Sequence, residues 1–229
     1  MIEAVIFDLD GLLLETEQVW DAVREQLVHE QGGRWHAGAQ ADMMGMSSPE
    51  WSRYMHEELG LETAPADISG EVVRRMGDRY RKTLPLIPGA SEAVDRLAAS
   101  WPLGLASSSN RELIDLALEL SGLGRYFRAT VSSEEVSRGK PASDVYLEAA
   151  RRLGVAPEAA VAVEDSRSGI LSARSAGMRV VAIPNASYPP DTETVASADA
   201  VLASLVELTP EAVARLDNVL GPTADHPPL

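Results

Sequence analysis

The 229-residue chain contains no cysteine, which excludes a disulfide framework and any cysteine-based zinc site. It has no apolar run near the roughly 20 residues that a membrane-spanning helix needs. Its 20 basic residues are outnumbered by 35 acidic ones, which gives a formal net charge of −15. This balance disfavours nucleic acid or an anionic membrane as a partner. We therefore expect a cytoplasmic monomer that binds neither nucleic acid nor membrane.

The most informative stretch is AVIFDLDG, residues 4–11, where an apolar run ends in two aspartates and a glycine. Such a run bounded by a turn is typical of a strand buried on both faces, and a strand this early leaves no room for a signal peptide. Asp8 and Asp10 would lie at its carboxyl end, where open α/β sheets bind ligands. Two carboxylates so close need a cation or a shared proton. An ordinary Asp-Gly turn is the alternative.

Strand patterns alternate with helical patterns along most of the chain. Further strands are predicted at 103–107, 129–131, 160–163, 180–183 and 200–202, and helices at 91–99, 111–120 and 143–153. Strands that alternate with helices indicate right-handed crossovers and a parallel sheet covered on both faces. The predicted fold class is therefore α/β, with a Rossmann-like, doubly wound parallel sheet.

One long segment interrupts this alternation. Residues 15–85 contain no convincing strand, only amphipathic helical patterns near 17–30, 49–59 and 68–83. Ser48 followed by Pro49 is typical of a capped helix start. We predict an all-helical insertion at 15–85 in a core formed by 1–14 and 86–229, with the last dozen residues frayed.

Four short motifs in order resemble the signatures of the haloacid dehalogenase-like superfamily. The first is DLDG at Asp8; the others are LGLASSS with Ser107, RGKP with Lys140, and VAVEDSRSG with Glu164 and Asp165. The resemblance extends from Met1 to about residue 201. It implies that the helical insertion is a C1-type cap domain over the active site.

The resemblance also implies a role for each acidic residue. Asp8 would be the nucleophile that forms an aspartyl-phosphate, and Asp10 the general acid and base. Asp8, Asp10 and Asp165 would bind Mg²⁺, with Glu164 mainly in the outer shell. For Glu164 and Asp165, an ordinary helix cap is the competing interpretation.

Phosphate would be bound by Lys140 and by the serines that follow the second strand. Lys140 is one of only two lysines in a chain that otherwise uses arginine, the other being Lys82. A compact ammonium can contact a phosphate and a carboxylate together; an ordinary surface lysine is the alternative. Ser107 would donate to the phosphate with help from Ser108 and Ser109, although serines here could equally be turn or cap residues.

The function that the resemblance implies is Mg²⁺-dependent hydrolysis of a small sugar or sugar-alcohol phosphate, as in phosphatases of the 2-deoxyglucose-6-phosphatase type. The main alternative is β-phosphoglucomutase, but Trp20 stands where that enzyme has a histidine and Ser48 where it has an arginine. A silent phosphate-binding protein is a further alternative. The predicted substrate contacts are Trp20, Ser48 and Asn110, together with the Gly45–Pro49 loop and Arg74 or Arg75 of the cap.

Overall fold

The computed structural model describes residues 1–218, so the predicted frayed terminus falls almost entirely outside the described residues. Its centre is a six-stranded sheet of order β3-β2-β1-β4-β5-β6 in which all pairings are parallel. The strands are β1 (Ala4–Phe7), β2 (Leu103–Ser107), β3 (Phe127–Ser132), β4 (Ala160–Glu164), β5 (Arg179–Ala182) and β6 (Ala200–Val201). The predicted doubly wound sheet is confirmed.

Strand β1 is buried on both faces, as its apolar run predicts. Val5 and Phe7 belong to the hydrophobic cluster on one side of the sheet, whereas Ile6 belongs to the cluster on the other side. Side chains of a strand alternate between faces, so an apolar residue at every position fits a sheet covered twice. The covering helices are α5 (Ala90–Ala98), α6 (Arg111–Ser121), α7 (Asp144–Leu153), α8 (Arg167–Ser175), α9 (Thr192–Ala196) and α10 (Pro210–Ala214).

Short 3₁₀ turns complete the α/β part: η1 (Leu123–Tyr126), η2 (Ser133–Glu135), η3 (Pro157–Ala159), η4 (Leu205–Glu207) and η5 (Arg215–Asn218). No helix within residues 1–218 is long and apolar enough to cross a membrane.

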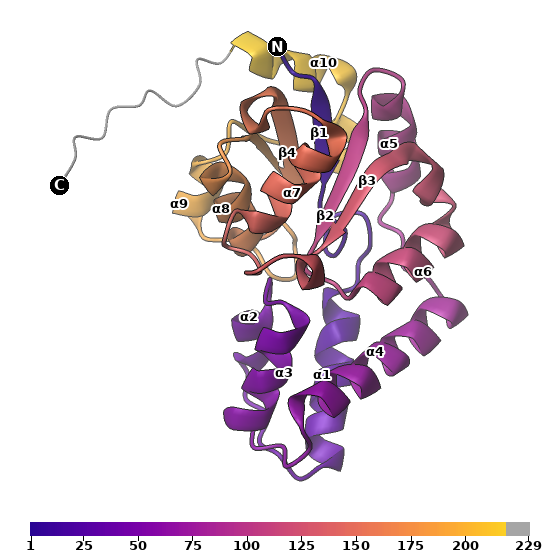
Figure 1. Ribbon diagram of the computed structural model, residues 1–229, viewed down its shortest axis with the longest axis vertical. Coiled ribbons are helices and arrows are strands. Elements are labelled where there is room, and N and C mark those ends of the chain that lie inside the picture. Colours follow the sequence, from indigo (N-terminus) through magenta and orange to yellow (C-terminus); the bar gives the residue numbers. More distant parts are fainter. Residues whose placement is uncertain (219–229) are drawn as a thin grey trace, which may run out of the picture.

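Four helices form a separate group below the sheet in Figure 1: α1 (Glu17–Glu30), α2 (Ala39–Met43), α3 (Ser48–Glu57) and α4 (Pro65–Lys82). We refer to α1–α4 and their loops as the cap. An antiparallel bridge between Leu14 and Leu86 sets the two connections to the sheet side by side. The predicted 17–30 helix is found at its predicted residues, whereas α2 was not predicted because its five residues show no helical period.

The start of α3 differs from the prediction by one residue. The cap residue is Ser47, whose backbone N–H donates to the Glu50 carboxylate at 2.7 Å, and Ser48 is the first helical residue. Ser47 and Glu50 form the Ser-x-x-Glu pair of a capping box, which satisfies backbone donors that the helix itself cannot. The prediction that Ser48 caps this helix is therefore wrong.

The order of the strands creates the site. In the sheet β1 lies between β2 and β4. Strands β2 and β3 continue the sheet on one side of β1, and β4, β5 and β6 continue it on the other side, so the order of the strands reverses at β1. The carboxyl ends of β1, β2 and β4 are neighbours, and this is where doubly wound sheets leave a crevice.

Candidate active site

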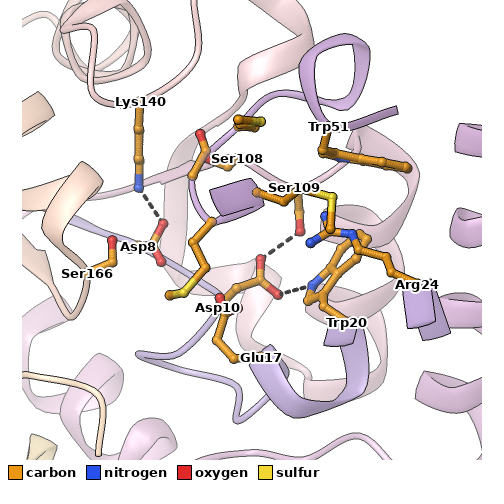
Figure 2. Close-up of a pocket in the computed structure, with 14 residues that line it drawn as sticks. Asp8, Asp10, Glu17, Trp20, Arg24, Trp51, Ser108, Ser109, Lys140 and Ser166 are labelled. Carbon is orange, nitrogen blue, oxygen red and sulfur yellow. Dashed lines mark hydrogen bonds and ion pairs between the residues drawn. The ribbon is translucent and has the colours of Figure 1, made fainter. Parts of the chain in front are cut away.

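The cap and the sheet enclose a small cavity at the carboxyl end of β1 (Figure 2). It holds about 50 Å³ of free space. The α/β part contributes Asp8, Asp10, Ser108, Ser109, Lys140 and Ser166; the cap contributes Glu17, Trp20, Arg24, Met43, Met44, Gly45, Met46 and Trp51. Polar groups from the sheet therefore face a mixed wall of aromatic, methionine and charged side chains.

Lys140 is buried between two carboxylates. Its Nζ donates to Asp8 Oδ1 and to Glu164 Oε1, each at 2.6 Å, and the Tyr146 hydroxyl donates to the same Glu164 oxygen at 2.6 Å. Burial alone would lower the pKa of Lys140, but Asp8 and Glu164 outweigh it and leave that pKa raised. Lys140 is therefore a fixed positive charge beside Asp8.

The Asp165 carboxylate lacks any such partner. It is fully buried, and neither of its side-chain oxygens has a hydrogen-bond donor among the described residues. Oxygens of Asp8, Glu164 and Asp165 lie within 4.8 Å of one another. Burial, and then Asp8 and Glu164, raise the pKa of Asp165 well above its ordinary value. An oxygen-only cluster with an unpartnered carboxylate fits a hard divalent cation, because the cation would supply the missing counter-charge.

A glycine leaves room for this carboxylate. A Cβ at Gly11 would lie 2.1 Å from Asp165 Oδ2, and Gly11 has a φ of +83°. Both the space and the left-handed backbone exclude a larger residue there. The Asp-Gly pair of the first motif thus forms a turn and also makes the acidic cluster possible.

Asp10 lies between the cap and the sheet. Its Oδ1 accepts from Thr16 Oγ1 at 2.6 Å and from Trp20 Nε1 at 3.2 Å, and its Oδ2 accepts from Ser109 Oγ at 2.7 Å. Figure 2 shows the carboxylate pointing toward Trp20 and Ser109 rather than toward Asp8. Donors from both parts of the molecule therefore hold the Asp10 carboxylate in one orientation at the cavity wall.

The three serines after β2 occupy different positions. Ser107 is fully buried and outside the cavity lining; its Oγ donates to Asp10 Oδ2 at 3.3 Å and accepts from the Ser109 backbone N–H at 3.0 Å. Ser108 and Ser109 line the cavity, and Ser108 Oγ donates to the Gly45 carbonyl of the cap at 3.0 Å. The structure therefore brings Ser108 and Ser109, more than Ser107, to the free space.

Several predicted substrate contacts do not face the cavity. Ser48 and Asn110 are absent from its lining; Asn110 directly precedes α6 and donates to Glu134 Oε1 at 2.8 Å. Arg74 and Arg75 pair with Glu71, on a face of α4 away from the cavity lining. These four residues therefore lie outside the cavity lining, and their contact with the substrate stays a prediction. Trp20 does line the cavity.

Three residues that the sequence motifs did not single out also line the cavity: Glu17, Arg24 and Trp51. Glu17, Trp20 and Arg24 are spaced by three and four residues, so they share one face of α1. That face also buries Val23 and Leu27. Charged residues on the buried face of an amphipathic helix were the signal that could have found them.

Comparison with known proteins places the chain in a family. The profile described as "Haloacid dehalogenase-like hydrolase" matches residues 5–183. A probable pseudouridine-5'-phosphatase of Drosophila melanogaster is 32% identical over 213 residues, covering 90% of this chain and 91% of the relative. Hexitol phosphatase B of Escherichia coli K12 is 32% identical over 227 residues, covering 91% and 95%.

The chain belongs to the haloacid dehalogenase-like hydrolase family. The prediction that it is an enzyme of the phosphatase class within this family is confirmed. A β-phosphoglucomutase from Clostridium difficile superposes with a TM-score of 0.83 at 23% identity, covering 96% of this chain and 98% of that structure. This likeness shows that the two proteins share a fold.

Proposed function

We propose that the protein is a Mg²⁺-dependent phosphomonoester hydrolase that works through an aspartyl-phosphate on Asp8. One observation carries the proposal. The Asp8 carboxylate ends a central strand with Lys140 on one oxygen, 2.6 Å away, and with the unpartnered Asp165 carboxylate beside it. A carboxylate placed between a fixed cation and a cation site is suited to attack an anionic phosphate.

Mg²⁺ would be held by Asp8, by Asp165 and by the backbone carbonyl of Asp10. Glu164 already accepts from Lys140 and Tyr146, which favours an outer role for it. When bound, the ion would neutralise the phosphoryl oxygens and the paired acids.

In the first half of the reaction, Asp8 attacks phosphorus and the bond to the leaving oxygen breaks. Lys140 remains charged throughout and reduces the repulsion between the Asp8 carboxylate and the phosphate. Ser108 and Ser109, which lie just before α6 and line the cavity, provide hydroxyl and backbone donors for the phosphoryl oxygens.

In the second half, water attacks phosphorus and releases Asp8. Asp10 acts in both halves: in the first it is placed to protonate the leaving oxygen, and in the second it takes a proton from the attacking water. Its contacts with Trp20 and Ser109 hold the carboxylate at the cavity wall where both steps occur.

The substrate is proposed to be a small sugar or sugar-alcohol phosphate. Hexitol phosphatase B and the probable pseudouridine-5'-phosphatase carry names of phosphorylated polyhydroxyl compounds. The free space of about 50 Å³ is below the roughly 300 Å³ of ordinary small-molecule sites, which supports a movement of the cap when substrate binds.

Phosphate release from a panel of sugar, polyol, nucleotide and glycolate phosphates tests the proposal, with Mg²⁺ or EDTA. Wild type should release phosphate only with Mg²⁺, and Asp8→Asn should reduce the rate by at least about 1,000-fold. Glucose 1-phosphate that isomerises after priming with a bisphosphate, without net hydrolysis, would indicate a mutase. Silence in both assays would indicate a binding protein.

A further inference from the structure

A second positive group lies in the cavity, and the mechanism above does not use it. The Arg24 guanidinium lies between the rings of Trp20 and Trp51, at 4.5 Å and 4.8 Å from their centroids. The side chain is 5% exposed and lines the cavity. Figure 2 shows Arg24 with the two tryptophans on one side of the pocket, and Lys140 with Asp8 on the other.

Arg24 has no ion-pair partner among the described residues. Its Nη1 donates to the amide oxygen of Gln40 at 3.0 Å, and its Nε–H is buried without an acceptor. A buried charge costs several kcal/mol unless it is paired and hydrogen-bonded. The two indole rings hold the guanidinium in place, but their attraction does not replace a counter-ion.

Gln40 separates Arg24 from the carboxylate to which it is linked. Gln40 Nε2 donates to Glu17 Oε2 at 2.9 Å, while Gln40 Oε1 accepts from Arg24. Burial, and then the Asp10 carboxylate, raise the pKa of Glu17 to about 7. Burial lowers the pKa of Arg24 to about 10, and the nearby carboxylates of Glu17, Asp10 and Asp21 oppose this shift. At neutral pH the guanidinium is therefore charged, and Glu17 is only partly so.

We propose that Arg24 binds a second anionic group, a carboxylate or a second phosphate, on the leaving portion of the substrate. The inference rests on the proposed phosphatase function and narrows its substrates to small phosphate esters that carry another negative charge. A planar guanidinium presents paired N–H donors that match the oxygens of both groups. The stack between Trp20 and Trp51 fixes its orientation before binding, which reduces the entropy lost. A neutral hydroxyl would leave the buried charge unpaired.

Matched substrates test the proposal. Glycerol 3-phosphate is compared with 3-phosphoglycerate for a carboxylate, and glucose 6-phosphate with glucose 1,6-bisphosphate for a phosphate. Wild type should show a kcat/KM at least about tenfold higher on the anion-bearing member of one pair or both. Arg24→Met should lower kcat/KM about 100-fold on that member, since truncating one side of a buried charge pair costs that much. On the neutral partner, the loss in kcat/KM should be smaller by a factor of at least about ten.

Arg53→Met is the control, because Arg53 is an exposed arginine of the same cap, on α3. It should leave the ratio within each pair as in wild type. A wild-type preference for the neutral members, or an equal loss on both members in Arg24→Met, would overturn the proposal. If circular dichroism shows that Arg24→Met does not fold, Arg24→Lys replaces it in the test. Lysine keeps the positive charge but lacks the paired N–H donors, so the kcat/KM preference for the anion-bearing substrate should shrink about tenfold. An unchanged preference in Arg24→Lys would overturn the proposal.

Hydrolysis of p-nitrophenyl phosphate by wild type is measured in parallel. No release from this generic ester or from any panel member would reject the phosphatase function itself. Release from the generic ester together with no preference for the second anion would reject only the role of Arg24.

Discussion

At the scale of single residues, the site is a group of buried charges with unequal partners. Lys140 balances Asp8 and Glu164, whereas within residues 1–218 Asp165 has no donor and Arg24 has no acid in direct contact. Each unpaired group lies where the proposed reaction supplies its partner: a divalent cation for Asp165 and a substrate anion for Arg24. Unsatisfied buried charges are rarely retained in a fold without such a ligand.

Glu17 provides a pH-dependent test at this scale. It is buried near Asp10, Arg24 and Glu15, and burial is the main cause that raises its pKa to about 7. Between pH 4.5 and 7 the folded protein keeps a proton that the unfolded chain has lost. The contribution of Glu17 to stability is therefore fully present below about pH 4.5 and is lost as the pH rises toward 7.

Replacing Glu17 by Gln should remove this dependence. From about pH 5 to about pH 8 the free energy of unfolding of wild type should fall by about 2 kcal/mol relative to that of Glu17→Gln. Urea unfolding at the two pH values measures it, with Glu57→Gln, a change at an exposed residue of α3, as the matched charge deletion. A constant difference between wild type and Glu17→Gln would contradict the assignment.

At the scale of elements, the regular parts of the fold were predictable. The apolar run AVIF predicts a buried strand, and β1 is found there. A serine at 143 and a glycine at 154 mark the two ends of a helix, and α7 lies between them. The sequence does not predict the short α2, because its five residues carry no helical period, and the predicted cap of α3 was wrong by one residue. The contact between Arg24 and Trp51 could not be predicted from the sequence, because it depends on how α1 and α3 pack together.

A glycine allows the loop between α2 and α3 to lie close against α8. Gly45 has a φ of +81°, and a Cβ there would lie 2.1 Å from Ser168 Oγ. Gly60 in the cap has a similar φ of +78°, but nothing lies within 4 Å of the position that a Cβ would take there. The two glycines therefore separate backbone strain from collision with the α/β part.

Gly45→Ala and Gly60→Ala should both lower the free energy of unfolding by about 1 kcal/mol through the left-handed backbone. Only Gly45→Ala should also displace the loop from α8 and reduce kcat/KM, by about tenfold or more, because misplaced cap residues orient the substrate poorly. Steady-state kinetics beside urea unfolding distinguishes the two effects. Equal kinetic losses in both variants would show that the contact with Ser168 is unimportant.

At the scale of the whole molecule, individual hydrogen bonds connect the cap to the α/β part around the cavity and at its outer edge. Gln18 donates to Ser187 Oγ, and the Tyr188 hydroxyl donates to Asp21, each at 3.1 Å. Hydrogen bonds of this kind contribute about 1 kcal/mol each, which allows the cap to open for substrate. A net charge of −15 would repel an anionic substrate, so local cations must attract it.

Metal binding should change the stability of the whole protein. Mg²⁺ at about 100 times its Kd should raise the free energy of unfolding by about 2.7 kcal/mol, because the unfolded chain lacks the site. Asp165→Asn should abolish this increase, whereas Asp67→Asn, a change at an exposed residue of α4, should retain it. Urea unfolding in Mg²⁺ and in EDTA measures both. Identical curves for wild type in the two buffers would argue against the metal site.

The central claim is that Asp8 becomes covalently phosphorylated, and trapping tests it most directly. Wild type is mixed with its best substrate and Mg²⁺, quenched in acid within the first turnover, digested and mapped by mass spectrometry. We predict one phosphoryl group on the peptide that carries Asp8, and none in Asp8→Asn. A burst of released alcohol with the phosphoryl group on another residue, or with no phosphorylated peptide at all, would contradict it.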